Sequence, residues 1–314
     1  MGCFYFEEVM TIDERLQKEA IQEICRKRFH GHDILISKYT PVFPSGVERE
    51  YARISRQYMR LLKESIEEEI PALKEQIMKE RGTYRKDYRS DSINDVLMML
   101  EKVLDKIQKK FTEKTQGYGL RRKLESLANM TRKLTIREWK KAVDKTLGIN
   151  IMEDYYMGEF FQTVLDRWVD ENVSLIKTIP ADTLGDMRVI VKEGFVNGKS
   201  ATSIMKEIQQ KYDVGKTHAR MLARDQIGKL NAAVTKAQQQ DAGIEEYIWC
   251  TVGDSRVRDA HQALNGKRFR WDDPPVVDVK TGRRCHPQED YQCRCRAKPV
   301  FKFGVFNAPA AKKE

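Results

Sequence analysis

Apolar residues between Val47 and Ile77 recur in steps of mostly three and four, with dense Lys, Arg and Glu between them. Such spacing places the apolar side chains on one face of a helix. A second stripe with the same spacing runs from Ile93 to Phe111, after the polar segment 81–92. Because two narrow stripes bury each other when helices pack side by side, the pattern predicts an antiparallel helical hairpin, with Pro71 as a candidate kink.

Other segments also have helical periodicity. The segment 12–30 has Ile12, Leu16, Ile21 and Ile24 as its apolar members. Ser200 and Thr217 are suited to cap helix N-termini, and Gly198 and Gly215 are suited to end helices. We therefore expect separate helices over residues 12–30, 120–147, 154–179, a stretch ending before Asn197, 200–212 and 217–240.

The pattern changes after residue 246, where short β-rich runs, paired prolines and glycines replace the helical stripes. The aromatic and β-branched run 247–251 predicts a strand, and 267–271 predicts another. Asp254 is a suitable N-cap for a helix that would end at Gly266. Pro274 and Pro275 predict a loop, and Cys293 and Cys295 are expected on a last strand.

These elements predict a mainly α protein with a small α+β module near its C-terminus. The long stripes favour interaction and assembly, and the shorter helices after residue 150 favour a globular bundle. We expect the following organisation: 1–150, a helical arm region for interaction and assembly; 151–245, a helical bundle leading into the C-terminal module; 246–300, the α+β module; and 301–314, a basic tail.

The chain has 314 residues, 33% of them charged, and a formal net charge of +10. Its apolar runs are too short to span a bilayer, and its first residues lack a basic region followed by an apolar one, so we expect neither a membrane span nor a secretory signal. From Glu246 onward, 14 Lys and Arg stand against 9 Asp and Glu, which is half of the net excess. Such a balance favours a polyanionic neighbour, either nucleic acid or an acidic protein surface.

Four of the six cysteines lie at or after Cys250, which favours a local thiol or metal site over a disulfide scaffold. Thiolate and imidazole are the ligands that zinc prefers, and four of them complete a structural site. We consider a zinc clip formed by His261, either Cys285 or His286, Cys293 and Cys295. The alternative is a metal-free β-hairpin with buried free cysteines and a His-Pro turn, because one residue between Cys293 and Cys295 is fewer than zinc knuckles have.

The arginines of this region could bind phosphate, and Trp271 and Tyr291 could stack on bases. The alternative is that the arginines form salt bridges to nearby Asp and Glu residues. The candidates for nucleic-acid contact are Arg268, Arg270, Arg283, Arg284 and Arg296.

Catalytic signals are weak. Adjacent Cys285 and His286 rarely achieve the geometry of a nucleophile and its base, and no glycine-rich phosphate loop is present. A metal-dependent nuclease built on His261 and Cys285–His286 is a third function class. Against it, no acidic residue directly precedes His261, and the second histidine and the asparagine of that chemistry are not evident.

Three motifs in order resemble one family: DSRVRDAHQALNG at 254–266, the loop at Pro274–Pro275, and Cys285-His286-Pro287 leading to Cys293-Arg294-Cys295. Together they resemble the phage Mu F-like head morphogenesis proteins, and residues 223–251 are similar to the helix and strand that lead into that domain. The resemblance covers about residues 180–300. Many relatives shorten the segment that is QEDYQ here, at 288–292. The motif residues that match are Asp254, Arg256, Arg258, Gly266, Pro287 and Arg294.

The resemblance implies a minor capsid protein of a tailed phage: a virion component made in the host cytoplasm, in several copies near the portal. It implies a function in head assembly and in DNA packaging or ejection, with the portal, capsid or scaffold proteins and packaged DNA as partners. A DNA-binding virion protein is the alternative. The resemblance implies no catalytic activity; some relatives are fused to toxin enzymes, and the final KPVFKFGVFNAPAAKKE leads us to expect no such fusion here.

Overall fold

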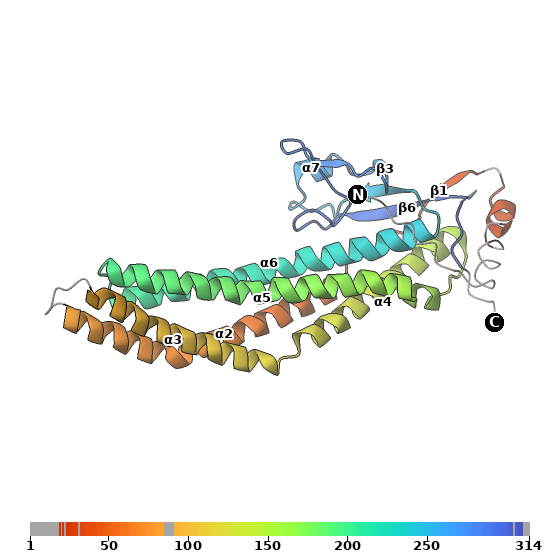
Figure 1. Cartoon of the computed structure of the whole chain (residues 1–314). Helices are drawn as coiled ribbons and strands as arrows, with labels where there is room; N and C mark the ends of the chain where they lie inside the picture. Colours follow the sequence, from red (N-terminus) through yellow and green to blue (C-terminus); the bar gives the residue numbers. More distant parts are fainter. Residues whose placement is uncertain are drawn as a thin grey trace. The chain divides into compact units, whose positions relative to one another are not determined.

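The computed structural model describes residues 19, 21, 23–30, 32–84, 91–303 and 305–309. It is mainly α-helical, with a small set of strands towards the C-terminus (Figure 1), as the sequence predicts. The expectations for Ile12 and Leu16 fall outside the described residues. Among those residues, no helix is both long enough and apolar enough to cross a membrane. The long helices are α2 (Ser45–Tyr84), α3 (Asp91–Gln116), α4 (Leu120–Leu147), α5 (Glu159–Val196) and α6 (Ala201–Asp241).

The predicted hairpin is confirmed by α2 and α3, which run in opposite directions side by side (Figure 1). Their contacts pair early residues of one helix with late residues of the other. Gln76 contacts Met99, the Tyr58 and Phe111 rings lie 5.7 Å apart, and Lys110 Nζ lies 2.6 Å from a Glu69 carboxylate oxygen. Pro71 lies inside α2 without ending it. The apolar stripe therefore determines the helix over its whole length.

Two predicted helix boundaries are wrong, because the segment expected to contain four helices contains two. Helix α5 continues through Pro180, since Ile176, Ile179 and Leu184 stay buried on either side of it. Helix α6 continues through Gly215, where an added Cβ would lie 2.8 Å from Thr183 Oγ1 and 3.1 Å from Met59 Cε. This glycine therefore permits close helix packing rather than ending a helix.

Of the two predicted helix N-caps, one is confirmed and one is wrong. Ser200 accepts a hydrogen bond from the Ser203 backbone N–H at 3.1 Å, and Gly198 has φ +72°, so this predicted end and start are confirmed. Thr217 is not an N-cap, because its hydroxyl donates to the Asp213 carbonyl within α6 at 3.0 Å. A further correction concerns the segment before residue 30. Cys25 and Ile21 are fully buried there, whereas Ile24 is 46% exposed.

The described contacts form two compact units, each discontinuous in sequence. The first unit comprises residues 1–48, 125–168 and 224–314, and the second comprises 49–124 and 169–223. The unit boundaries fall inside α2, α4, α5 and α6, whereas composition alone placed a boundary near residue 150. The expected functions of the four sequence segments stay predictions.

The first unit contains a four-stranded antiparallel sheet in the order β1-β6-β2-β3. Its strands are β1 (Ile34–Ile36), β2 (Glu246–Cys250), β3 (Arg268–Arg270) and β6 (Arg296–Lys302). Tyr247 and Trp249 alternate into a small core with Trp271, Val277, Cys293 and Cys295. A larger core joins α4 to Phe301, Phe303, Phe306 and Ala308, so residues that we expected in a basic tail are buried.

The remaining elements are short. They are the 3-10 helix η1 (Asp154–Met157), helix α7 (Asp259–Gln262), and the paired strands β4 (Val276–Asp278) and β5 (Arg283–Arg284). The helix predicted from Asp254 to Gly266 is thus reduced to four residues, and Asp254 instead accepts the Arg256 backbone N–H in a turn. Part of the expected proline loop forms β4. Cys293 and Cys295 lie just before β6 rather than on a strand.

Candidate metal centre

Three of the predicted ligands come together in the first unit. The Nδ1 atom of His261, on α7, lies 3.6 Å from the Sγ atom of Cys293 and 3.6 Å from that of Cys295. All three donor atoms lie within 4.8 Å of one another, and all three residues are buried. They are the only group of three or more His, Cys, Asp or Glu ligands with this spacing in the described part of the chain. The arrangement is therefore a candidate metal centre.

The backbone of the segment 288–292 and of the residues after it explains how Cys293 and Cys295, so close in sequence, can share one centre. Gln288 and Gln292 have positive φ values of 73° and 52°, so the chain turns back on itself at both ends of this segment. The backbone N–H groups of Gln288 and Cys295 both point to the Cys293 sulfur, at 3.4 Å each. On α6, Gly228 allows the segment to approach, because an added Cβ would lie 3.3 Å from the Gln288 carbonyl oxygen.

A buried carboxylate orients the histidine. Asp290 Oδ2 lies 3.0 Å from His261 Nε2, and the Asp290 side chain is 1% exposed. If Nε2 carries the proton and donates it to Asp290, the Nδ1 lone pair is directed at the two sulfurs. Arg258 and Arg283 place guanidinium nitrogens 2.9 and 3.0 Å from the same carboxylate. The Trp249 ring, 5.3 Å from the imidazole and perpendicular to it, restricts the remaining freedom of His261.

These contacts give the two thiols opposite proton affinities. Hydrogen bonds from the Cys295 thiol and from backbone N–H groups, together with the contact to His261, lower the pKa of Cys293 to about 5, against the effect of burial. The pKa of Cys295 is raised, because its thiol donates to Cys293 in a buried setting. Burial alone would lower the pKa of His261, but its contacts with Cys293 and Asp290 outweigh burial and raise it. One thiolate beside an imidazole is thus available for a cation.

The other two predicted ligands are held elsewhere. His286 is buried, and its Nδ1 atom lies 2.8 Å from the Tyr247 hydroxyl. Its Nε2 atom lies 3.5 Å from Lys236 Nζ, and burial lowers its pKa. Cys285 is half-buried against the small aromatic core, and burial raises the pKa of its thiol. Neither residue joins the group of three, so the predicted fourth ligand is not supplied at this position.

The family-motif residues surround the centre. Asp254 binds Arg256 at 3.1 Å and Arg294 at 2.7 Å, and Arg258 binds Asp290 as above. Gly266 has φ +78° and donates its N–H to the Trp249 carbonyl, which closes the turn after α7. Pro287 is buried beside the turn at Gln288.

The arginines proposed for nucleic-acid contact each have partners within the unit. Arg270 binds Asp272 at 2.8 Å, Arg284 binds Asp273, and Arg283 binds Asp290. Arg268 lies 3.6 Å from Glu246, and Arg296 donates to the Pro41 carbonyl at 3.4 Å. The salt-bridge alternative therefore describes four of the five arginines, and the fifth contacts a backbone carbonyl.

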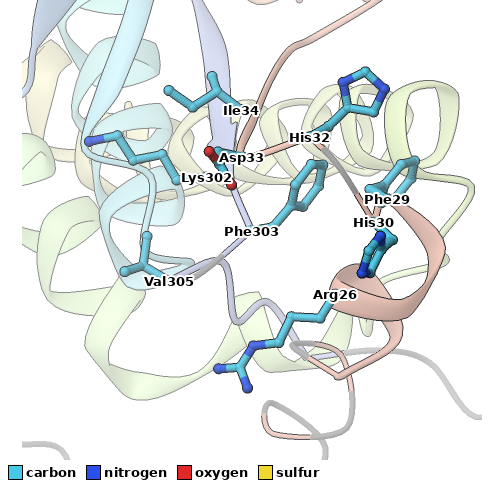
Figure 2. A pocket seen from close by; sticks show the side chains of 9 residues that line it. All are labelled: Arg26, Phe29, His30, His32, Asp33, Ile34, Lys302, Phe303 and Val305. Carbon is cyan, nitrogen blue, oxygen red and sulfur yellow. The ribbon is translucent and has the colours of Figure 1, made fainter.

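A cavity of about 590 Å³ lies away from the metal centre in the first unit, between residues 26–34 and 302–305 (Figure 2). Its aromatic wall is the stacked pair Phe29 and Phe303, with ring centroids 4.8 Å apart and planes inclined by 6°. Figure 2 shows Arg26, His30 and His32 around the same opening. The stack joins the segment before β1 to the segment after β6, which gives this region a packing function.

Sequence reasoning missed Asp290 and Gly228 as parts of the site, and Tyr247 as the partner that holds His286 away from it. The closeness of Asp290 to Cys293 in sequence was a usable signal, because histidine ligands commonly bind a carboxylate through their second nitrogen. Tyr247 and Gly228 gave no such signal, since strand and helix patterns account for both residues.

Comparison with known proteins identifies the segment that contains this centre. Residues 186–298 match the family model described as Phage Mu protein F like protein, which confirms the resemblance seen in the motifs. An uncharacterized protein of Haemophilus influenzae is 36% identical over 133 residues, which are 41% of this chain and 28% of that protein. The Mu-like prophage FluMu F protein of the same organism is 36% identical over 75 residues, 23% of this chain and 17% of that protein. The chain thus spans less than a third of the length of these relatives. No solved structure matches the chain.

Proposed function

Because residues 186–298 match the Phage Mu protein F-like family, we propose that the chain is a minor structural protein of a tailed-phage head, bound near the portal. The family match carries this proposal, because it covers the candidate metal centre together with the motifs around it. In the proposal the protein acts in head assembly and in genome packaging or ejection, as a non-enzymatic virion component in several copies. Its partners are the portal protein and capsid or scaffold proteins.

Two structural features support protein partners over DNA as the main contact. The arginines proposed for nucleic-acid contact have partners within the unit, so binding DNA phosphate would require breaking those contacts. The α2–α3 hairpin carries both charge signs, as in the pairs that Lys110 and Lys114 form with Glu68. A mixed surface of this kind suits a protein partner better than a uniformly anionic duplex.

The test is co-expression of the full chain with the portal, scaffold and capsid proteins of the same genome, followed by size-exclusion chromatography. We expect co-elution with the portal protein, and the chain to be present in purified virions. A parallel sample in which an unrelated phage portal replaces the cognate one controls for nonspecific association. Absence from virions together with failure to co-elute with any of these head proteins would overturn the proposal.

We also propose that the centre of His261, Cys293 and Cys295 holds a structural zinc ion. In tetrahedral zinc sites with Zn–S near 2.3 Å and Zn–N near 2.05 Å, the nitrogen and sulfur ligands stand about 3.6 Å apart. Both His261-to-sulfur distances are 3.6 Å. The histidine nitrogen therefore already lies at the distance from both sulfurs that the ion requires, and the Asp290 contact orients the imidazole as metal-bound histidines require.

Elemental analysis of full-length protein purified without added metal tests the zinc proposal. We expect about one zinc per chain, because three soft donors with this spacing bind the ion tightly. Cys293→Ser should lose most of the metal, whereas Cys250→Ser should keep it, since Cys250 lies on β2 outside the group of three. Metal-free wild-type protein, or equal zinc in both variants, would refute the proposal.

A further inference from the structure

We propose that the zinc centre is open, and that its fourth position binds an oxygen of a phosphate group entering through the arginine-lined pocket above it. This inference rests on the proposed zinc ion. It deepens that proposal by naming the class of ligand that the centre recognises.

The three ligand residues themselves line a pocket. A hollow of about 140 Å³ is lined by His261, Cys293 and Cys295 and, around them, by Arg224, Arg256, Arg258 and Arg294. A closed structural zinc site needs a fourth protein donor, and sites with three protein ligands leave that position to water or an external ligand. Within the described residues the group has three members, since His286 binds Tyr247 and Asp290 binds His261 through its other nitrogen. The open side of the centre thus faces the arginines.

The charge around the pocket favours an anion. Four arginines line it (224, 256, 258 and 294), and they pair with three carboxylates, those of Glu48, Asp254 and Asp290. A zinc ion held by two thiolates and a neutral imidazole adds no net charge. The arginine lining therefore keeps a net charge of about +1 beside the ion, which favours an anion, and the planar guanidinium forks match phosphate oxygens better than they match a single carboxylate.

The pocket arginines have more N–H donors than their present partners use. A guanidinium has five N–H donors in a planar fork that matches phosphate oxygens. In the described contacts, Arg294 uses one terminal nitrogen on Asp254, at 2.7 Å, and its side chain is 19% exposed. Arg256 binds the same carboxylate, and its side chain is 68% exposed. The hollow has room for a group the size of several water molecules, at roughly 30 Å³ each.

The experiment uses full-length protein loaded with Co²⁺ in place of zinc, because the visible d–d bands of Co²⁺ report its coordination. Inorganic phosphate is titrated first, and then a phosphomonoester (glycerol phosphate), to distinguish a free phosphate from a substituted one. We expect saturable band shifts with phosphate and little change with acetate at equal concentration. Arg294→Gln should weaken phosphate binding by about tenfold, the effect of losing one charge-assisted hydrogen bond. Arg294→Lys should recover part of the binding, since lysine keeps the charge without the fork.

Arg268→Gln is the matched control, because Arg268 is an arginine of the same module that pairs with Glu246 and does not line the pocket. It should leave both the Co²⁺ content and the phosphate response unchanged. If the Co²⁺ spectrum does not change with phosphate, or changes equally with acetate, the open phosphate site is refuted and the zinc proposal is unaffected. Failure to bind Co²⁺ or zinc would remove both, whereas the head-protein proposal is tested separately by co-elution and virion content.

Discussion

Replacing Asp290 by Asn tests whether this buried carboxylate sets up the metal centre. The change keeps the shape of the side chain and removes its charge. The Asp290 side chain is 1% exposed, and its Oδ2 atom lies 3.0 Å from His261 Nε2. An amide at this position can present either an acceptor or a donor to the imidazole. It therefore no longer holds the proton on Nε2 and the lone pair on Nδ1.

Two free energies change in this variant, and they differ in size. Breaking a buried ion pair costs about 3–5 kcal/mol when the remaining charge stays buried. Here the remaining charges belong to Arg258 and Arg283, whose side chains are 45% and 38% exposed and can turn towards water. We therefore expect a smaller loss in the free energy of unfolding, about 1–3 kcal/mol. The loss in zinc affinity should be about 10–100-fold, the usual effect of removing the carboxylate partner of a histidine ligand.

Zinc affinity is measured by competition with a chelator of known affinity, and stability by urea unfolding of the zinc-loaded protein. Asp272→Asn is the control, because that exposed carboxylate binds Arg270 in the same module and does not contact the centre. An Asp290→Asn variant with the zinc affinity of the wild type and of Asp272→Asn would refute the reasoning, because His261 would then be oriented without the carboxylate.

Three further predictions concern the helical packing, pH and metal removal. Gly215→Ala should destabilise the second unit by about 1–3 kcal/mol in urea unfolding, because its Cβ would lie 2.8 Å from Thr183 Oγ1; Gly185→Ala in α5, with nothing within 4 Å of the added Cβ, should be neutral or stabilising. Burial alone would raise the pKa of Glu138. Hydrogen bonds from Lys141, from the Tyr39 hydroxyl at 2.5 Å and from the Val42 N–H at 2.9 Å outweigh burial and lower that pKa from the ordinary 4.5. Its contribution to stability is therefore fully present above about pH 4.5 and lost as pH falls through the lower folded pKa, so Glu138→Gln should flatten the acid limb of a stability-versus-pH curve, and an unchanged limb would contradict this account. Chelation should open the segment between residues 266 and 292 to limited proteolysis while the cleavage pattern of α2–α3 stays the same, because the proposed zinc ion would join α7 to the segment before β6. Equal protection with and without chelator would favour the metal-free hairpin.

Local patterns in the sequence were sufficient for most of the helices. The stripes of α2 and α3 predicted both helices and their antiparallel pairing, since i, i+3 and i+4 spacing is a property of each helix alone. The motifs from Asp254 to Cys295 were likewise enough to indicate the family whose model matches residues 186–298. The mainly α class with a small α+β module follows from the same periodicities.

Long-range contacts decided what those patterns left open. Gly215 and Pro180 have the local preferences of helix ends, yet buried contacts with residues distant in sequence keep α5 and α6 continuous. Among the histidine and cysteine candidates, spacing could not choose between Cys285 and His286 as a fourth ligand. In the tertiary structure His286 contacts Tyr247, His261 lies beside Cys293 and Cys295, and Asp290 contacts the second nitrogen of the His261 imidazole. A ligand set depends on side chains that meet in space, and those distances are fixed only when the sheet, α6 and α7 pack together.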